Sequence, residues 1–252
     1  MRRLAAVGRA ELLLLARNRT AAFNAVLLPL LIIGLLGAGL ADLDDPDATA
    51  RLVTGMLGFT LLGVLYYTLV SAYVARREDL VLKRLRVGVL TDTEILIGTA
   101  GPAAVVALGQ MVLFVVAGSV FAGLPVPANA AVMLIGVLGG TVVFVLLAAV
   151  SAGFTRTVEL AQITTLPVLF LGFVGADFAV PADALPPAVA GTLRLLPLGP
   201  TLELVRLGWL GAPGQGALGL LGEAAAPAGL LAVWIVLGWL AVRRWFRWEP
   251  RR

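Results

Sequence analysis

Residues 52–74 read LVTGMLGFTLLGVLYYTLVSAYV, a run of 23 residues without a charged side chain. One helix needs about 20 apolar residues to cross a bilayer core about 30 Å thick. Comparable apolar blocks occupy residues 21–40, 95–121, 130–152, 160–180 and 224–242. The sequence therefore predicts an all-α integral membrane protein with six transmembrane helices. Residues 1–252 are expected to form a single transmembrane domain, because no stretch between the blocks is long enough for a soluble core.

The composition favours the same class of protein. Hydrophobic residues make up 60% of the chain and charged residues 13%, whereas soluble domains have about 45–50% and about 25%. The mean hydropathy is +0.99. Cysteine and histidine are both missing from the sequence, which excludes disulfides, zinc sites built from thiolate or imidazole, and Cys–His or Ser–His nucleophiles. We expect neither a catalytic residue nor a metal site.

The basic residues predict the orientation in the membrane. Sixteen of the 19 lie in segments that share one side if the apolar blocks alternate in direction, and only Arg51, Arg194 and Arg206 lie on the other. Basic residues accumulate on the cytoplasmic side, so both termini are predicted to be cytoplasmic. The net charge of +4 does not indicate nucleic-acid binding, because the basic residues flank apolar blocks instead of covering one polar face.

The predicted cytoplasmic segment after the second span has the most informative pattern. It reads ARREDLVLKRLRVGVLTDTEILIG over residues 75–98. Leu82, Leu85 and Val89 have helical spacing, and Thr91 with Glu94 forms a T-x-x-E capping box. Asp79 precedes Lys83 by four residues, the favourable order for a helical ion pair. We predict a short amphipathic helix followed at once by a capped membrane helix; the alternative is a solvated basic loop.

Three other segments outside the spans have interpretable patterns. Residues 2–20 interleave leucines with arginines, which fits an interfacial helix or a basic topology anchor. Residues 181–223 are apolar but interrupted by prolines, which favours short helices in the outer leaflet or an interfacial lid. The tail RRWFRWEPRR, residues 243–252, is typical of an interfacial anchor.

Several transport mechanisms are disfavoured by the sequence. The middles of the first four spans contain no ionisable residue, although ion-coupled carriers generally need one there. No G-x-x-x-x-G-K-[ST] phosphate loop occurs, so active transport would need a nucleotide site on another polypeptide. Two alternatives remain open: a membrane scaffold that moves no solute, and a channel, for which no ring of charged residues is evident.

The whole chain resembles a permease subunit of the ABC-2 type, the membrane component of ATP-binding-cassette exporters. Family members typically show R-E-x-G-T-L-K-R-L-R-x-x-P-L after the second span. Arg77, Glu78, Lys83, Arg84, Leu85, Arg86 and Leu90 fit this pattern, whereas Leu80-Val81 replace Gly-Thr and Val89 replaces Pro. A weaker likeness covers LPPAVAGTLRLLPLGPTLELVR, residues 185–206, and the family's proline-rich outer segment.

The resemblance implies an exporter of the bacterial cell membrane that moves an amphipathic substrate (a drug, lipid, antibiotic or glycan-like molecule) outward. Two permease subunits, identical or related, would pair in the lipid and sit on two ATP-binding subunits, which would hold ATP and Mg²⁺; this chain would bind no cofactor. A coupling helix at residues 77–87 would contact the ATPase. The implied contact residues are Arg77, Glu78, Leu82, Lys83, Arg84, Leu85 and Arg86, with Leu82 and Leu85 buried in the partner's cleft.

The family's architecture also implies a substrate path along the interface between two permeases. The aromatic and hydroxyl residues expected to line it lie in the second and fifth spans: Phe59, Tyr66, Tyr67, Thr164, Thr165 and Phe170.

Overall fold

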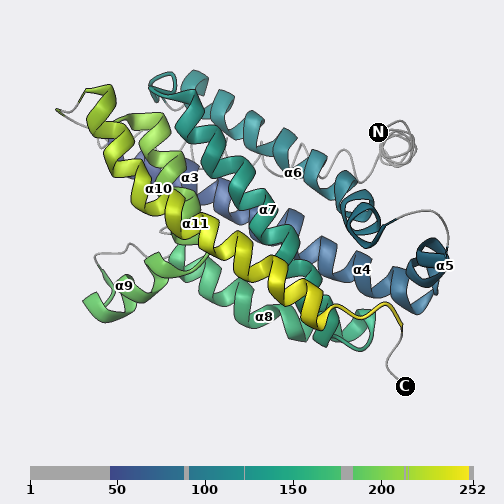
Figure 1. Cartoon of the computed structure of the whole chain (residues 1–252). Helices are drawn as coiled ribbons and strands as arrows, with labels where there is room; N and C mark the ends of the chain where they lie inside the picture. The colour runs from purple at the N-terminus through teal and green to yellow at the C-terminus, as the bar shows by residue number, and fades with distance from the viewer. Residues whose placement is uncertain are drawn as a thin grey trace.

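The computed structural model describes residues 46–87, 91–121, 123–176, 184–212, 214 and 216–249, and all regular secondary structure in them is helical (Figure 1). Five segments are long and apolar enough to cross a membrane: Thr49–Glu78, Asp92–Val120, Ala130–Phe154, Val158–Gly175 and Leu218–Trp245. They match the second to sixth predicted spans. For the part of the chain that the structure describes, the all-helical class with several candidate membrane spans is thereby confirmed. The predicted first span (21–40) and interfacial helix (2–20) lie outside the described residues, so the count of six stays a prediction.

The first described span is the central helix of the bundle. It consists of α3 (Pro46–Phe59), the π-helical stretch η1 (Thr60–Tyr67) and α4 (Thr68–Glu78), which follow one another without a break. Leu62, Leu65 and Leu69 in its middle are completely buried. η1 packs against α6 (Asp92–Phe121), α7 (Ala130–Phe154) and α8 (Val158–Gly175). A long π-helical stretch is unusual, and π-bulges are frequent at functional sites.

Local capping residues explain where two of the surrounding helices begin. The Asn129 side chain accepts hydrogen bonds from the backbone N–H groups of Ala131 and Val132 at the start of α7. Thr157 Oγ1 accepts one from the Leu160 N–H at the start of α8. The last span, α11 (Ala217–Trp245), is longer than the predicted block 224–242. It begins before Glu223, whose exposed side chain can lie in the first turns of the helix without desolvation.

Two short helices, α9 (Pro187–Leu195) and α10 (Leu198–Leu210), lie between α8 and α11. α10 packs closely against α7 at Gly136 and Gly140, where a Cβ atom added to Gly136 would lie 2.9 Å from the Leu204 Cβ. The Gly136–Gly140 motif therefore permits close helix contact, as its spacing predicts. Gly211, in the left-handed region with φ 77°, ends α10.

The helix α5 (Val81–Val87) lies at one end of the bundle, and α9 lies at the other (Figure 1). Residues 246–249, which follow α11, are at the same end as α5. We call this end the α5 end. The predicted helix at residues 77–87 is shorter in the structure, because Arg77 and Glu78 form the last turn of α4.

Candidate functional site at the α5 end

The turn between α4 and α5 consists of Asp79 and Leu80. The Leu80 backbone N–H donates to the Arg77 carbonyl at 3.1 Å, and Leu80 has φ 59°, in the left-handed region. It is the one non-glycine residue with positive φ among the described residues. A side chain in this conformation costs about 1–2 kcal/mol, whereas glycine adopts it readily. The turn therefore gives a physical reason for the glycine that the ABC-2 motif carries here.

The helix α5 turns its basic side outward. Lys83, Arg84 and Arg86 are exposed, and so is Val87 at 83%. Leu85 is half-buried. Leu82 is completely buried inside this chain, which differs from the expectation that it inserts into a partner. Because a side chain at 0% exposure has no surface left to offer, Leu82 anchors α5 to its own bundle.

Contacts with the tail and with α6 hold α5 in place. Lys83 pairs with Glu249 at 2.9 Å, and not with Asp79 as its spacing predicts. Arg86 pairs with Asp92 at the start of α6 at 3.0 Å, and its guanidinium lies 5.0 Å from the ring centre of Trp248. Exposed ion pairs of this kind contribute little singly. Two ion pairs and one cation–π contact on a single short helix together restrict its orientation.

The tail after α11 packs against the α5 end of the bundle. The Phe246 ring meets Trp248 edge-on at 4.8 Å and Tyr73 of α4 at 5.8 Å. The Tyr73 hydroxyl donates to the Leu96 carbonyl of α6 at 3.0 Å. Residues 246–249 thus form an intramolecular strap that connects α11 with α4 and α5, whereas the interfacial anchor stays a prediction.

The predicted capping box at the start of α6 is confirmed. The Thr91 N–H donates to Glu94 Oε2 at 2.8 Å, and the Glu94 N–H donates to Thr91 Oγ1 at 3.3 Å. This reciprocal pair satisfies backbone donors that a helix start leaves unpaired. It fixes the first turn of α6 directly after α5.

Arg77 is buried, with 1% of its surface exposed. Its Nη1 donates to the Ala152 carbonyl at 2.7 Å, and its Nη2 donates to the carbonyls of Thr155 and Arg156. These oxygens belong to the last turn of α7 and the connection to α8, where carbonyls lack intrahelical partners and the helix dipole attracts a cation. Arg77 therefore joins the end of α4 to the junction of α7 and α8, and it has no surface for a contact with another chain. Glu78, its neighbour, is exposed.

A chain of hydroxyl groups continues from this junction into the bundle. Thr155 Oγ1 donates to the Ser151 carbonyl at 2.8 Å and lies 2.8 Å from Thr164 Oγ1 of α8. Ser151 Oγ lies 2.9 Å from the Tyr66 hydroxyl of η1. Tyr66 and Thr164, two of the predicted path residues, are thus connected through α7 to the region that Arg77 holds.

The structure separates the predicted path residues into buried and accessible ones. Tyr66 and Thr165 are fully buried, and Thr165 Oγ1 donates to the Ala161 carbonyl at 2.7 Å. Phe170 is 68% exposed, Phe59 36%, Thr164 is exposed and Tyr67 half-buried. The Phe59 ring contacts Phe173 of α8 at 5.5 Å. An open cavity of about 570 Å³ is lined by Leu166, Pro167, Leu169, Phe170 and Phe173.

The protein-family model described as ABC-2 type transporter matches residues 2–209 of this chain. The chain belongs to the ABC-2 type transporter family. A comparison with curated proteins finds no match. The match includes every described span except α11. It also includes α5 and the contact of Arg77 with the carbonyls between α7 and α8, which we call the Arg77 junction.

Two features of the candidate site in this ABC-2 permease are not predicted by the sequence. Phe173 lies beside Phe59 and in the same cavity as Phe170, yet nothing in the sequence distinguishes it from the other phenylalanines of the spans. The strap formed by Trp248 and Glu249 was also missed. One signal for it exists: a single carboxylate among the arginines of the tail, at Glu249.

Proposed function

We propose that this permease is the membrane subunit of an ATP-driven exporter and that α5 is its coupling helix. The α5 end would face the cytoplasm, since the basic residues accumulate in the segments on that side. A separate ATP-binding subunit would bind ATP and Mg²⁺ and dock beneath α5. Members of the family generally work with such a subunit, which supports the two-component arrangement.

The observation that carries the proposal is the basic outer face of a short helix that is fastened to the rest of the bundle. Leu80 in the turn and Arg84 and Val87 on α5 are exposed, and they replace Leu82 as the proposed contact. Exposed apolar and arginine side chains suit a docking surface that meets an acidic partner. This contact would be bordered by Lys83, Leu85 and Arg86. The last turn of α4, with Arg77 and Glu78, would support α5 without being at the centre of the contact.

The fastening gives α5 a mechanical connection to the spans. A rigid-body shift of α5 would displace α6 through the Arg86–Asp92 pair and α4 through the turn at Leu80. The Arg77 junction would then pass the shift from α4 to α7 and α8. In this way ATP-driven closure of the partner could reach the membrane interior.

The substrate path would lie on the face shared by η1 and α8, against a second permease subunit. Phe170 and Phe173 of α8 line the open cavity, and Phe59 at the end of α3 contacts Phe173. Tyr67 of η1 is half-buried. The helix α8 thus carries an exposed aromatic side chain, Phe170, and an exposed hydroxyl group, Thr164, a combination that suits an amphipathic substrate. Tyr66 and Thr165 would support this face from inside the bundle.

The test replaces the outer face of α5 and leaves its anchors intact. Arg84→Glu combined with Val87→Asp should weaken copurification of the ATPase from the native host about tenfold, as loss of a central interface contact does. The control, Arg194→Glu, changes an exposed arginine on α9 at the other end of the bundle and should leave copurification unchanged.

Substrate-stimulated ATP hydrolysis by the copurified complex separates an exporter from a scaffold that moves no solute. The exporter proposal expects stimulation in the parent complex and its loss in the α5 variant. Full partner binding and full export by the α5 variant would show that α5 is not the coupling helix.

A further inference from the structure

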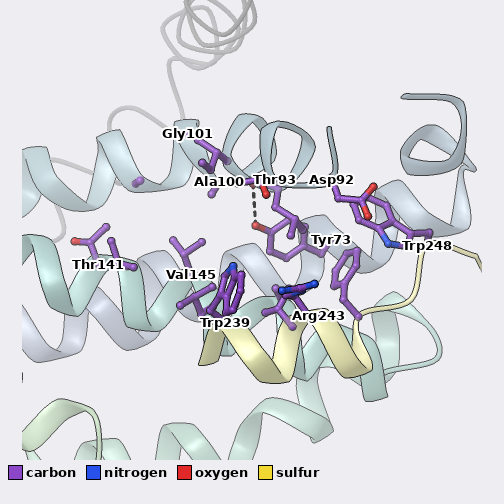
Figure 2. Close-up of a pocket in the computed structure, with 18 residues that line it drawn as sticks. Tyr73, Asp92, Thr93, Ala100, Gly101, Thr141, Val145, Trp239, Arg243 and Trp248 are labelled. Carbon is purple, nitrogen blue, oxygen red and sulfur yellow. Dashed lines mark hydrogen bonds between the residues drawn. The ribbon is translucent and has the colours of Figure 1, made fainter. Parts of the chain in front are cut away.

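A second cavity lies at the α5 end, away from the α8 face. Its volume is about 530 Å³, within the range of about 300–1,000 Å³ found for small-molecule sites. Helices α6, α7 and α11 form its walls, with Tyr73 of α4 and Trp248 of the tail. Figure 2 shows Trp239 and Arg243 of α11 facing α6, with Tyr73 between the two helices.

The walls of this cavity are apolar and follow the membrane-spanning helices inward. The lining includes small and branched side chains of the three helices: Ala100, Gly101, Ala104, Val145, Ala149 and Val242. From Asp92 to Ala104 the cavity extends along α6 by about 18 Å, at 1.5 Å per residue. This length is roughly the depth of one leaflet, since the hydrocarbon core of two leaflets is about 30 Å thick.

The mouth of the cavity is polar and carries a positive charge. Arg243 lies 4.7 Å from the ring centre of Trp239, and within the described part of the chain it makes neither an ion pair nor a hydrogen bond. The carboxylate at the mouth, Asp92, is already paired with Arg86. An excess positive charge therefore stands at the end of the apolar cavity where the last turn of α11 lies.

We infer that this cavity binds one anionic phospholipid from the leaflet at the α5 end. Its acyl chain would lie between α6 and α11, and its phosphate would meet the Arg243 guanidinium. A guanidinium forms bidentate, charge-assisted hydrogen bonds with phosphate. The lipid would touch Tyr73, Trp239 and Trp248, so it would sit against the strap that holds α5. This site is separate from the proposed substrate path at α8 and does not depend on it.

The experiment measures lipid retained by the purified full chain. The chain is delipidated in detergent, incubated with equal amounts of dioleoyl-phosphatidylglycerol and dioleoyl-phosphatidylcholine, and analysed by native mass spectrometry. We expect one phosphatidylglycerol per chain. Arg243→Gln should weaken its binding about tenfold, the effect of losing one charge-assisted hydrogen bond. The control Arg244→Gln removes the adjacent charge, which does not line this cavity, and should have little effect.

A second pair of variants tests the apolar part of the site. A Cβ atom added at Gly101 has no atom within 4 Å, so Gly101→Leu places a bulky side chain at the cavity wall without distorting α6 and should reduce lipid retention. Gly109→Leu makes the same change on the same helix in open space outside the cavity and should retain the lipid. Equal retention of the two lipids, or unchanged retention in Arg243→Gln or Gly101→Leu, would overturn the proposal. Melting temperatures of all four variants identify any that fail to fold.

Discussion

The Arg77 junction provides the sharpest test of how the spans are held together. Arg77→Met keeps much of the aliphatic length and removes the charge that three carbonyl oxygens share. Each buried carbonyl that loses its donor costs about 1–3 kcal/mol, so the loss of three donors costs about 3 kcal/mol or more. We expect a value near the lower end, because carbonyls at a helix end regain part of their hydrogen bonding from water.

The decrease in the free energy of unfolding caused by Arg77→Met can be measured as a change in melting temperature. For a chain of this size, 1 kcal/mol corresponds to about 2–4 °C, so about 3 kcal/mol predicts a decrease of about 6–12 °C. The assay is thermal unfolding of the purified chain in detergent, followed by size-exclusion chromatography. Arg77→Lys should recover only part of the decrease, since an ammonium group cannot present a planar fork to carbonyls on both α7 and the following connection.

Arg76→Met is the matched control. Arg76 is the preceding residue, and it is half-buried, with Nη1 donating to Thr99 Oγ1 at 3.1 Å. Loss of an arginine there should cost about 1 kcal/mol or less. If Arg77→Met and Arg76→Met have the same melting temperature, the three carbonyl contacts do not stabilise the junction and the reasoning is refuted.

Two further predictions concern the turn and the orientation. Leu80→Gly should raise stability by about 0.5 kcal/mol, because relief of the left-handed side chain exceeds the entropic cost of glycine; a lower melting temperature would contradict this account of the turn. In this cysteine-free chain, Val126→Cys between α6 and α7 should react with an impermeant maleimide on intact cells. Leu80→Cys should react only after the cells are permeabilised. The reverse labelling pattern would contradict the predicted orientation.

The described spans were predictable because each must satisfy a condition set by the membrane alone. About 20 apolar residues are needed whatever the neighbouring helices do, so the blocks at 95–121 and 130–152 agree closely with α6 and α7. The capping box at Thr91 was predictable for a similar reason, since its two hydrogen bonds join residues three apart. The start of α11 was placed too late, because one exposed carboxylate does not end a helix.

The candidate site was less predictable because its contacts join residues far apart in the chain. Helical spacing identified the apolar side of α5, but it does not specify which surface covers that side. In the structure, Leu82 is completely buried by other residues of the same chain. Likewise, Arg76 and Arg77 are indistinguishable in a basic run, and only the position of α7 makes one of them a buried donor. Periodicity specifies faces, whereas tertiary packing assigns their partners.

The distribution of contacts indicates where this permease is able to open. α4, α5, α6 and the end of α11 are joined at the α5 end by Arg86, Trp248 and Phe246, so a force on α5 moves them together. α8 is the least buried of the five described spans, and its exposed side carries Phe170. Since packed helices move as units and separate where they share the fewest contacts, a shift of α5 would separate the joined helices from α8 most readily. Under the proposed function, the substrate path would then open beside α8 and between two permeases, without breaking the core of either chain.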